Sequence, residues 1–378
     1  MRILVAHLAD AARSGGMSRL MGRVHDELSA RGHQVTYLTA DDVPAAVRGG
    51  AGRFLFALLV RRAVTAAARR GEPIDVVNVH EPHGAAVAAV RTGLAGTAVI
   101  AMTHGVEQRG WEVAQGHAPA RPRLKSRLLY PLTSLPLCRV TLANADHIIC
   151  LNRQDRDFLR DRFGIDPSHV TSVFPGADPV FGMAAAARTH EHGRRLVFAG
   201  TWLPRKGVAE LAAAFGSLVE RGLNVSLDVV GAGVPTATVL GAFSARAGAR
   251  VCTVECANDS MTAAALAGAD IFVLPSIFEG TPLTLIEAMW SGLPIITTRT
   301  AGMQDVVTDG RSGLLVPPAD VPALAAAIAR LVGDRDLRES LGREAHRVAS
   351  SRYTWPNAAA TFETAYRAAC SRHASRAH

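Results

Sequence analysis

The chain has 378 residues, of which 48% are hydrophobic, so it is long enough for two domains with separate cores. Its 41 lysines and arginines outnumber 33 acidic residues, and the formal net charge of +8 favours anionic partners without choosing among them. The five scattered cysteines exclude a disulfide framework and indicate a reducing cytoplasm, and no apolar run reaches the ~18 residues of a transmembrane helix.

The first half of the chain alternates predicted strands with predicted helices. Residues 3–8 are too short an apolar run for a signal peptide before Asp10 and predict a first strand. Gly15 and Gly16 then form a glycine-rich loop, followed by a helix over residues 18–31 and a strand over residues 34–38. This unit is typical of Rossmann-like domains, although the Gly-x-Gly-x-x-Gly spacing of dinucleotide sites is absent.

Residues 45–70 combine an apolar run with six arginines. Such a helix either lies on an anionic membrane or packs into a core with its arginines in solvent, and we favour packing. A second basic stretch over residues 121–127 keeps a peripheral membrane contact open as an alternative.

Further strands are predicted over residues 75–79, 97–102 and 147–151, the last as the final major strand of this half. His104 and Gly105 follow the strand over residues 97–102, at the end where open α/β sheets bind ligands. Asp155 and Asp157 spell Asp-x-Asp inside a helix predicted over residues 153–163, so we interpret them as a solvated helix face. A linker is expected over residues 184–193.

The second half repeats the alternation and predicts a second doubly wound α/β domain. Strands are predicted over residues 195–199, 223–230, 251–255, 269–274, 294–298 and 312–316, and helices over 322–332, 336–349 and 355–372.

The segment over residues 276–289 carries the chemistry. Thr281 is expected at the N-cap of a helix and Pro282 at its first position, so the free amides of Leu283 and Thr284 point back toward the preceding strand. Unsatisfied amides and the positive end of the helix dipole together form an anion site. A phosphate is the expected guest.

Two carboxylates accompany this anion site. Glu279 lies on the loop, and Glu287 lies ~7.5 Å along the helix. Ionised carboxylates only accept hydrogen bonds, so they suit hydroxyl groups, a sugar ring for Glu279 and a ribose for Glu287. Lys206, near the start of another helix, opposes that helix dipole and is stabilised by a nearby anion.

The pattern Glu279-x7-Glu287, with Gly280 between them and Glu-Ala-Met followed by Gly292-Leu293-Pro294, resembles the donor-site signature of the retaining glycosyltransferases of family 4. The resemblance implies the GT-B fold, an α/β architecture of two Rossmann-like doubly wound domains facing a central cleft. It implies an acceptor-binding domain over residues 1–180, a donor-binding domain over 190–353, and a C-terminal helix over 354–372 that crosses back to the first domain.

The resemblance also implies roles for individual residues. Family members commonly carry an arginine where Thr201 stands, so Arg205 is expected to compensate beside Lys206 at the diphosphate. The glycine pair either approaches the donor phosphates or forms a tight turn only. The residues expected in catalysis are His104, Lys206 and Glu279. The residues expected to bind the donor are Gly15, Gly16, Arg205, Lys206, Glu279, Gly280, Thr281, Pro282, Leu283, Thr284 and Glu287.

The expected reaction transfers a hexosyl or hexosaminyl group, with retention, from a UDP or GDP sugar to a hydroxyl or amine acceptor. Neither a metal nor another cofactor is expected. The acceptor stays open between a small natural product, a polysaccharide and a lipid-linked sugar, and nucleic acid is not an expected partner. A GT-B sugar-nucleotide epimerase and a non-catalytic nucleotide-sugar-binding relative are the alternatives. We expect a bacterial, cytoplasmic protein, with or without membrane association.

Overall fold

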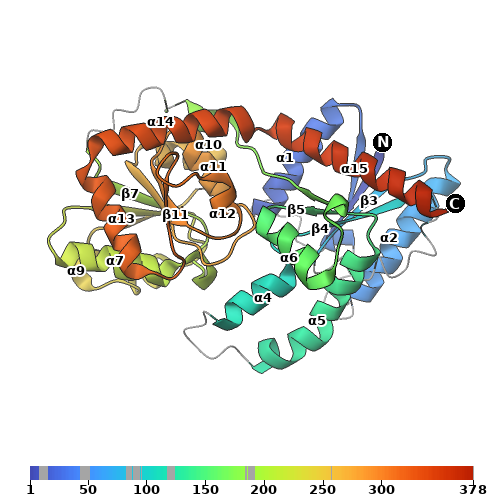
Figure 1. Ribbon diagram of the computed structural model, residues 1–378, viewed down its shortest axis with the longest axis horizontal. Helices are drawn as coiled ribbons and strands as arrows, with labels where there is room; N and C mark the ends of the chain where they lie inside the picture. Colours follow the sequence, from blue (N-terminus) through green and yellow to red (C-terminus); the bar gives the residue numbers. More distant parts are fainter. Residues whose placement is uncertain are drawn as a thin grey trace. The chain divides into compact units, whose positions relative to one another are not determined.

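The computed structural model describes residues 1–7, 16–42, 52–81, 87, 94, 96–116, 124–183, 185, 192–256 and 258–377. The chain divides into two compact units. Unit 1 comprises Met1–Phe174 and Trp355–His378, and unit 2 comprises Pro175–Thr354. Each unit is built on a parallel sheet of six strands (Figure 1). The doubly wound α/β class expected from the sequence is therefore confirmed.

Unit 1 has the strand order β2-β1-β3-β4-β5-β6. Its strands are β1 Arg2–Ala6, β2 Gln34–Leu38, β3 Val76–His80, β4 Ala98–Met102, β5 His147–Cys150 and β6 Val170–Ser172. The order reverses between β1 and β3, and open α/β sheets bind ligands beyond the carboxyl ends of strands at such a switch point. The expectation that residues 147–151 form the last major strand misses β6, a three-residue strand that pairs with β5.

The helices of unit 1 include one from the far end of the chain. The described helices of unit 1 are α1 Gly16–Ala30, α2 Gly52–Arg69, α4 Glu107–Gly116, α5 Leu124–Asn144, α6 Arg153–Phe163 and α15 Trp355–Ala377, with short 3-10 turns η1 Ala40–Asp42 and η4 Pro167–His169. The terminal helix α15 packs on α1, β3, β4 and β5 (Figure 1). Its Tyr366 is fully buried, and the Tyr366 hydroxyl accepts a hydrogen bond from Asn78 Nδ2 at 3.0 Å.

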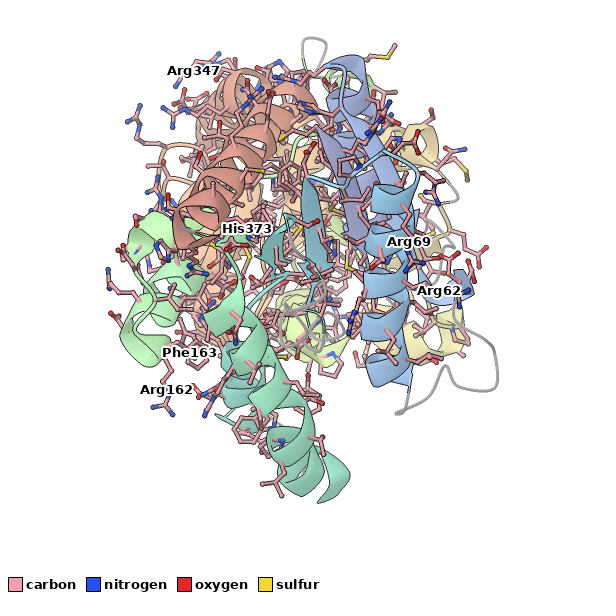
Figure 2. All side chains as sticks on the ribbon, turned by 90° about the vertical axis from the view of Figure 1, so that its right-hand side faces the viewer. Arg62, Arg69, Arg162, Phe163, Arg347 and His373 are labelled. Atoms are coloured by element: carbon pink, nitrogen blue, oxygen red, sulfur yellow. The ribbon has the colours of Figure 1, made fainter. Side chains whose placement is uncertain are left out.

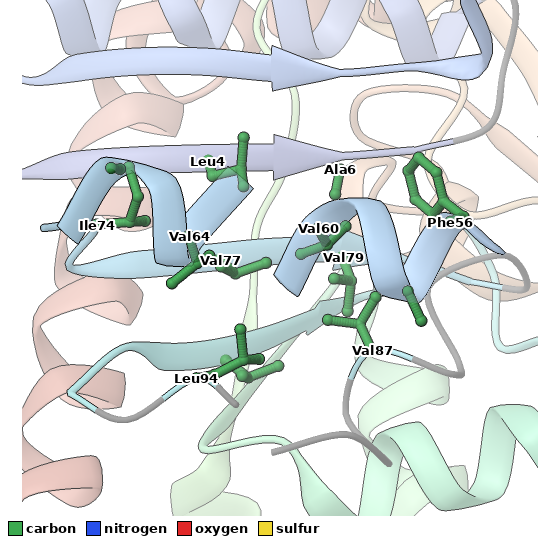
Figure 3. Packing of buried hydrophobic residues seen from close by; sticks show 13 residues of the cluster. Leu4, Ala6, Phe56, Val60, Val64, Ile74, Val77, Val79, Val87 and Leu94 are labelled. Carbon is green, nitrogen blue, oxygen red and sulfur yellow. The ribbon is translucent and has the colours of Figure 1, made fainter. Parts of the chain in front are cut away.

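Helix α2 has its apolar side in the core of unit 1. Phe56, Val60 and Val64 are buried against residues of β1, β3 and β4 (Figure 3). Arg62 and Arg69 lie on the outer side of the helix (Figure 2). This is the packed arrangement that we favoured. No described helix is long and apolar enough to cross a membrane. Residues 121–123 of the second basic stretch lie outside the described residues.

Helix α6 has the predicted bounds, but the predicted exposure of one of its acidic residues is wrong. Asp155 is fully buried rather than solvated. Its carboxylate accepts hydrogen bonds from Arg109 Nη1 at 2.8 Å and from Asn152 Nδ2 at 2.7 Å. Asp157 is partly exposed, as expected. The helical pattern gave no sign of Arg109, which lies 46 residues earlier in the chain.

Unit 2 has the strand order β12-β11-β10-β7-β8-β9, with its reversal between β7 and β10. Its strands are β7 Arg195–Ala199, β8 Ser226–Val230, β9 Val251–Val254, β10 Ile271–Leu274, β11 Ile295–Thr298 and β12 Leu314–Val316. Its helices are α7 Val208–Glu220, α8 Thr236–Leu240, α9 Ala245–Gly248, α10 Asp259–Ala267, α11 Leu283–Trp290, α12 Ala301–Val306, α13 Val321–Gly333 and α14 Arg335–Arg352, with 3-10 turns η5 Pro179–Gly182 and η6 Pro204–Lys206.

Candidate functional site

The candidate site of unit 2 lies at its switch point, beyond the carboxyl ends of β7 and β10. The turn η6 follows β7, and the loop over residues 275–282 follows β10. The two segments are joined by backbone hydrogen bonds, because the Arg205 carbonyl accepts from the amides of Ile277 at 2.8 Å and Phe278 at 3.3 Å. The two segments are far apart in the sequence, but they lie together at the carboxyl end of the sheet.

Three charged side chains meet at this end of the sheet. Glu279 Oε1 lies 2.7 Å from Lys206 Nζ and 2.6 Å from Arg205 Nη1. The side chains of Lys206 and Glu279 are each 9% exposed, whereas that of Arg205 is 48% exposed. Two cations share one carboxylate, so the group carries one net positive charge where solvent screening is weak. It is suited to attract an anion.

Gly207 fixes the position of Lys206. Its φ is 70°, and a Cβ on Gly207 would lie 1.9 Å from the carbonyl oxygen of Pro275. Only a glycine allows η6 to approach the end of β10 this closely in this conformation. The close approach brings the Lys206 ammonium within reach of the carboxylate of Glu279.

Helix α11 begins beside the three charges, but not with the cap that we expected. Pro282 occupies the N-cap, and no side chain in the described part of the protein caps the helix. Thr281 packs instead against the start of α12, where its Oγ1 would lie 1.9 Å from a Cβ on Gly302. Within the described chain, the amides of Leu283 and Thr284 donate to no backbone carbonyl. These amides are therefore suited to an anion.

Two further buried residues belong to this part of unit 2, one in α11 and one in the loop that precedes it. Glu287 is 2% exposed, on the second turn of the helix. Ser276, two residues after β10, is fully buried, and its hydroxyl has no hydrogen-bond partner among the described residues. The sequence gave no reason to single out Ser276, since a serine after a strand is common in loops.

In unit 1, three histidines lie at or just beyond the carboxyl ends of three strands. His7 follows β1, His80 ends β3, and His104 follows β4. His104 Nε2 lies 3.0 Å from His80 Nδ1, and the rings of His80 and His7 are 5.5 Å apart. The structure thus places His104 beyond the carboxyl end of β4, beside His80, with His7 on the other side of His80; the sequence analysis singled out neither partner. Gly16 is the first residue of α1, and Gly15 lies outside the described residues.

Two of these histidines, His80 and His104, are neutral at pH 7. Burial, and secondarily the charge of His7, lowers the pKa of His104 to about 4. Burial also lowers the pKa of His80 well below its usual value. A hydrogen bond between two neutral imidazoles requires one N–H donor and one bare nitrogen, which couples the tautomers of the two rings. His104 therefore acts as a hydrogen-bonding group rather than as a cation.

The lowered pKa of His104 predicts a pH-dependent stability. Below about pH 6.5 the unfolded chain binds a proton at this histidine that the folded chain does not, so stability falls as the pH falls toward 4. Glu81, whose pKa is raised mainly by burial, contributes with the opposite sign. Comparison with His104→Asn isolates the histidine. Between pH 7.5 and 5 we expect the wild type to lose about 1–2 kcal/mol relative to that variant in urea unfolding. Equal losses in both proteins would contradict this assignment.

Two family models match the chain. "Glycosyltransferase Family 4" matches residues 14–181, and "Glycosyl transferases group 1" matches residues 193–334. The chain belongs to glycosyltransferase family 4. The two matched segments lie largely in unit 1 and unit 2, respectively.

Curated relatives of this family 4 protein act on different acceptors. It is 33% identical over 223 residues to an MMP alpha-(1->4)-mannosyltransferase of Mycolicibacterium hassiacum, covering 58% of this chain and 53% of that protein. It is 28% identical over 248 residues to a D-inositol 3-phosphate glycosyltransferase of Corynebacterium glutamicum, covering 61% and 59%. The matches thus span little more than half the length of these relatives.

Solved structures show the same fold over nearly the whole chain. A sucrose-phosphate synthase from Thermosynechococcus elongatus has a TM-score of 0.77 at 21% identity, covering 97% of this chain and 98% of that one. HepE of Anabaena, in complex with UDP, has a TM-score of 0.69 at 16% identity, covering 96% and 99%. The family 4 chain therefore has the GT-B fold, as its donor-site signature implied.

Proposed function

We propose that this family 4 protein is a retaining glycosyltransferase, which moves a sugar from a nucleoside-diphosphate sugar to a hydroxyl or amine acceptor without a metal. The observation that carries the proposal is the meeting of Lys206, Arg205 and Glu279 beside the free amides of α11. HepE, which shares the fold, has been solved with UDP and with UDP-glucose, which supports a nucleotide sugar as donor.

The three charges suit the leaving group of such a reaction. In glycosyl transfer, positive charge grows on the sugar and negative charge grows on the departing diphosphate. Lys206 and Arg205 would stabilise that diphosphate together with the amides of Leu283 and Thr284. The Arg205 guanidinium reaches the same carboxylate oxygen as Lys206, which supports the expectation that Arg205 compensates for Thr201.

Glu279 would change partners when the donor binds. In the free protein its carboxylate neutralises part of the charge of Lys206 and Arg205. A bound diphosphate would take over both cations, so the carboxylate would become available to accept hydrogen bonds from sugar hydroxyls. We assign the ribose to Glu287 and a contact with the donor sugar to His104. In this proposal the diphosphate oxygen takes the proton of the acceptor on the same face of the sugar.

A ligand screen tests the donor assignment. We expect UDP, GDP or one of their sugars to stabilise the protein, by about 2.7 kcal/mol at a hundred times its dissociation constant. Lys206→Ala should lose this stabilisation, because a buried cation at the diphosphate is gone. Thermal unfolding with each nucleotide, in both proteins, makes the measurement. If no nucleoside diphosphate stabilises the wild type, the donor assignment is wrong.

Acceptor dependence separates transfer from the alternatives. With the preferred donor, NMR of the product should show a glycoside of unchanged anomeric configuration, formed only when a hydroxyl or amine compound is added. Inversion at C2 of the nucleotide sugar without any acceptor would instead indicate an epimerase. Binding without conversion of the donor would indicate a non-catalytic relative.

A further inference from the structure

Unit 2 has a hollow at the amino ends of its strands, whereas the candidate donor site lies beyond their carboxyl ends. The hollow has a volume of about 340 Å³. Its lining comes from segments that precede strands or connect helices: Arg194 directly precedes β7, Asn224 lies shortly before β8, and Arg335 begins α14. The donor site follows the carboxyl ends of β7 and β10, so the two places lie at opposite ends of the strands.

The lining of this hollow is basic. It includes Arg194, Arg335, Arg338 and His192, and none of the lining residues that the structure describes carries a carboxylate. The side chains of Arg194 and Arg335 are exposed, and each lacks an ion-pair or hydrogen-bond partner in the part of the chain that the structure describes. Unpaired guanidiniums gathered around one hollow repel each other, and a bound anion removes that repulsion.

Two nearby carboxylates, those of Asp270 and Asp334, are already engaged by backbone amides. Asp270 Oδ2 accepts from the amides of Arg194 and Arg195, at 2.8 Å each. Asp334 caps α14 by accepting from the Leu337 amide at 2.9 Å. Neither acid forms a direct ion pair with the guanidinium of Arg194 or Arg335, so contact with these two acids does not neutralise the charge of either guanidinium.

The third arginine is held in place by the protein. Arg338 is 2% exposed, and its Nη1 donates to the carbonyls of Leu331 at 2.6 Å and Val332 at 3.0 Å, at the end of α13. Gly193 lies against it so closely that a Cβ there would be 2.4 Å from Cζ. Burial lowers the pKa of Arg338, which shows how poorly its charge is solvated.

Asn224, another polar residue of the lining, also has a hydrogen-bond donor to offer. The side-chain oxygen of Asn224 accepts a hydrogen bond from Arg250 Nη1 at 2.7 Å. With its oxygen engaged in this way, Asn224 presents its NH₂ group as the unused partner. Donors without competing acceptors are the lining that an anion requires, and guanidinium groups match the oxygens of a phosphate in pairs.

We infer that this hollow is a second anion site, which binds a small phosphorylated compound and is separate from the donor site. A volume of about 340 Å³ lies at the small end of ligand pockets, so it admits a phosphate group with a small organic part. The inference stands on the residues of this hollow and does not depend on the proposed glycosyl transfer.

Calorimetric titration of the full chain with inorganic pyrophosphate at low salt tests this site. The wild type is expected to bind two equivalents, one at each site. The double variant Arg194→Ala/Arg335→Ala should lose the second site, with an affinity there about a hundredfold weaker, tenfold or so for each charged donor. Lys206→Ala should lose only the donor-site equivalent. Arg246→Ala, which removes an exposed cation paired with Glu220 elsewhere on unit 2, should bind like the wild type.

A steric variant gives an independent reading. Gly333 lines the hollow, and a Cβ there would meet no atom of the described residues within 4 Å, so Gly333→Leu should fold and obstruct the site without changing any charge. Unchanged binding in the double variant would overturn the inference, as would a wild type whose only equivalent disappears in Lys206→Ala. A single equivalent that survives Lys206→Ala but not the double variant would support this site and count against the donor site.

Discussion

Glu279→Ala is expected to lower glycosyl transfer from the preferred nucleotide sugar by at least about a hundredfold, a typical cost of removing one transition-state contact. The carboxylate is the shared partner of Lys206 and Arg205 and, in our proposal, the acceptor for sugar hydroxyls. Its removal leaves two cations side by side without their counter-charge. Sugar positioning is lost, while the attraction for a diphosphate is not.

This asymmetry makes the variant informative. Glu279→Ala should bind the free nucleoside diphosphate at least as tightly as the wild type, yet transfer far more slowly. Lys206→Ala should be impaired in both respects. Steady-state transfer rates and nucleotide titrations give the two quantities, and circular dichroism checks that each variant is folded.

Glu220→Ala is the matched control for the loss of a carboxylate. Glu220 also pairs with an arginine on unit 2, but its side chain is 49% exposed, so its removal should change transfer little. Undiminished transfer by Glu279→Ala would show that the site is assigned to the wrong residues.

Gly207→Ala is expected to destabilise the protein by about 3–5 kcal/mol. The added methyl group would overlap the carbonyl oxygen of Pro275, and the residue would also have to keep a φ of 70°. Either η6 or the loop after β10 must move. Because Lys206 immediately precedes Gly207, transfer should fall along with the stability.

Gly222→Ala separates the two causes. Gly222 has a φ of 85°, but a Cβ there would lie within 4 Å of no atom that the structure describes, so this variant carries the backbone strain without the overlap. We expect it to cost about 1–2 kcal/mol and to leave transfer unchanged. Urea unfolding of both variants makes the comparison. Equal losses of stability would argue against the close approach of Gly207 to β10.

The sequence predicted what local patterns encode. The apolar strands and the amphipathic helices follow from short-range periodicity, which is why α6 has the predicted bounds and both sheets were expected. The short strand β6 carries too few residues to show a period. The burial of Asp155 depends on a distant arginine, and such pairings have no local signal.

The same limit applies to the candidate site. The loop, the helix start and the acids of residues 276–289 were readable because they are adjacent in the chain. The contact between Lys206 and Glu279, and the row of histidines in unit 1, arise only when parallel strands align their carboxyl ends. Strand order, which the sequence did not specify, decides which ends become neighbours.

The position of α15 has a consequence for how the protein is made. Unit 2 is continuous in the chain, whereas unit 1 contains α15, whose Tyr366 is buried against Asn78. During synthesis, unit 2 can therefore reach its native state while the earlier-made residues of unit 1 still wait for their last helix. Unit 1, most of which is made before unit 2, can therefore be completed only after it, and until then the apolar groups that α15 covers need protection from aggregation.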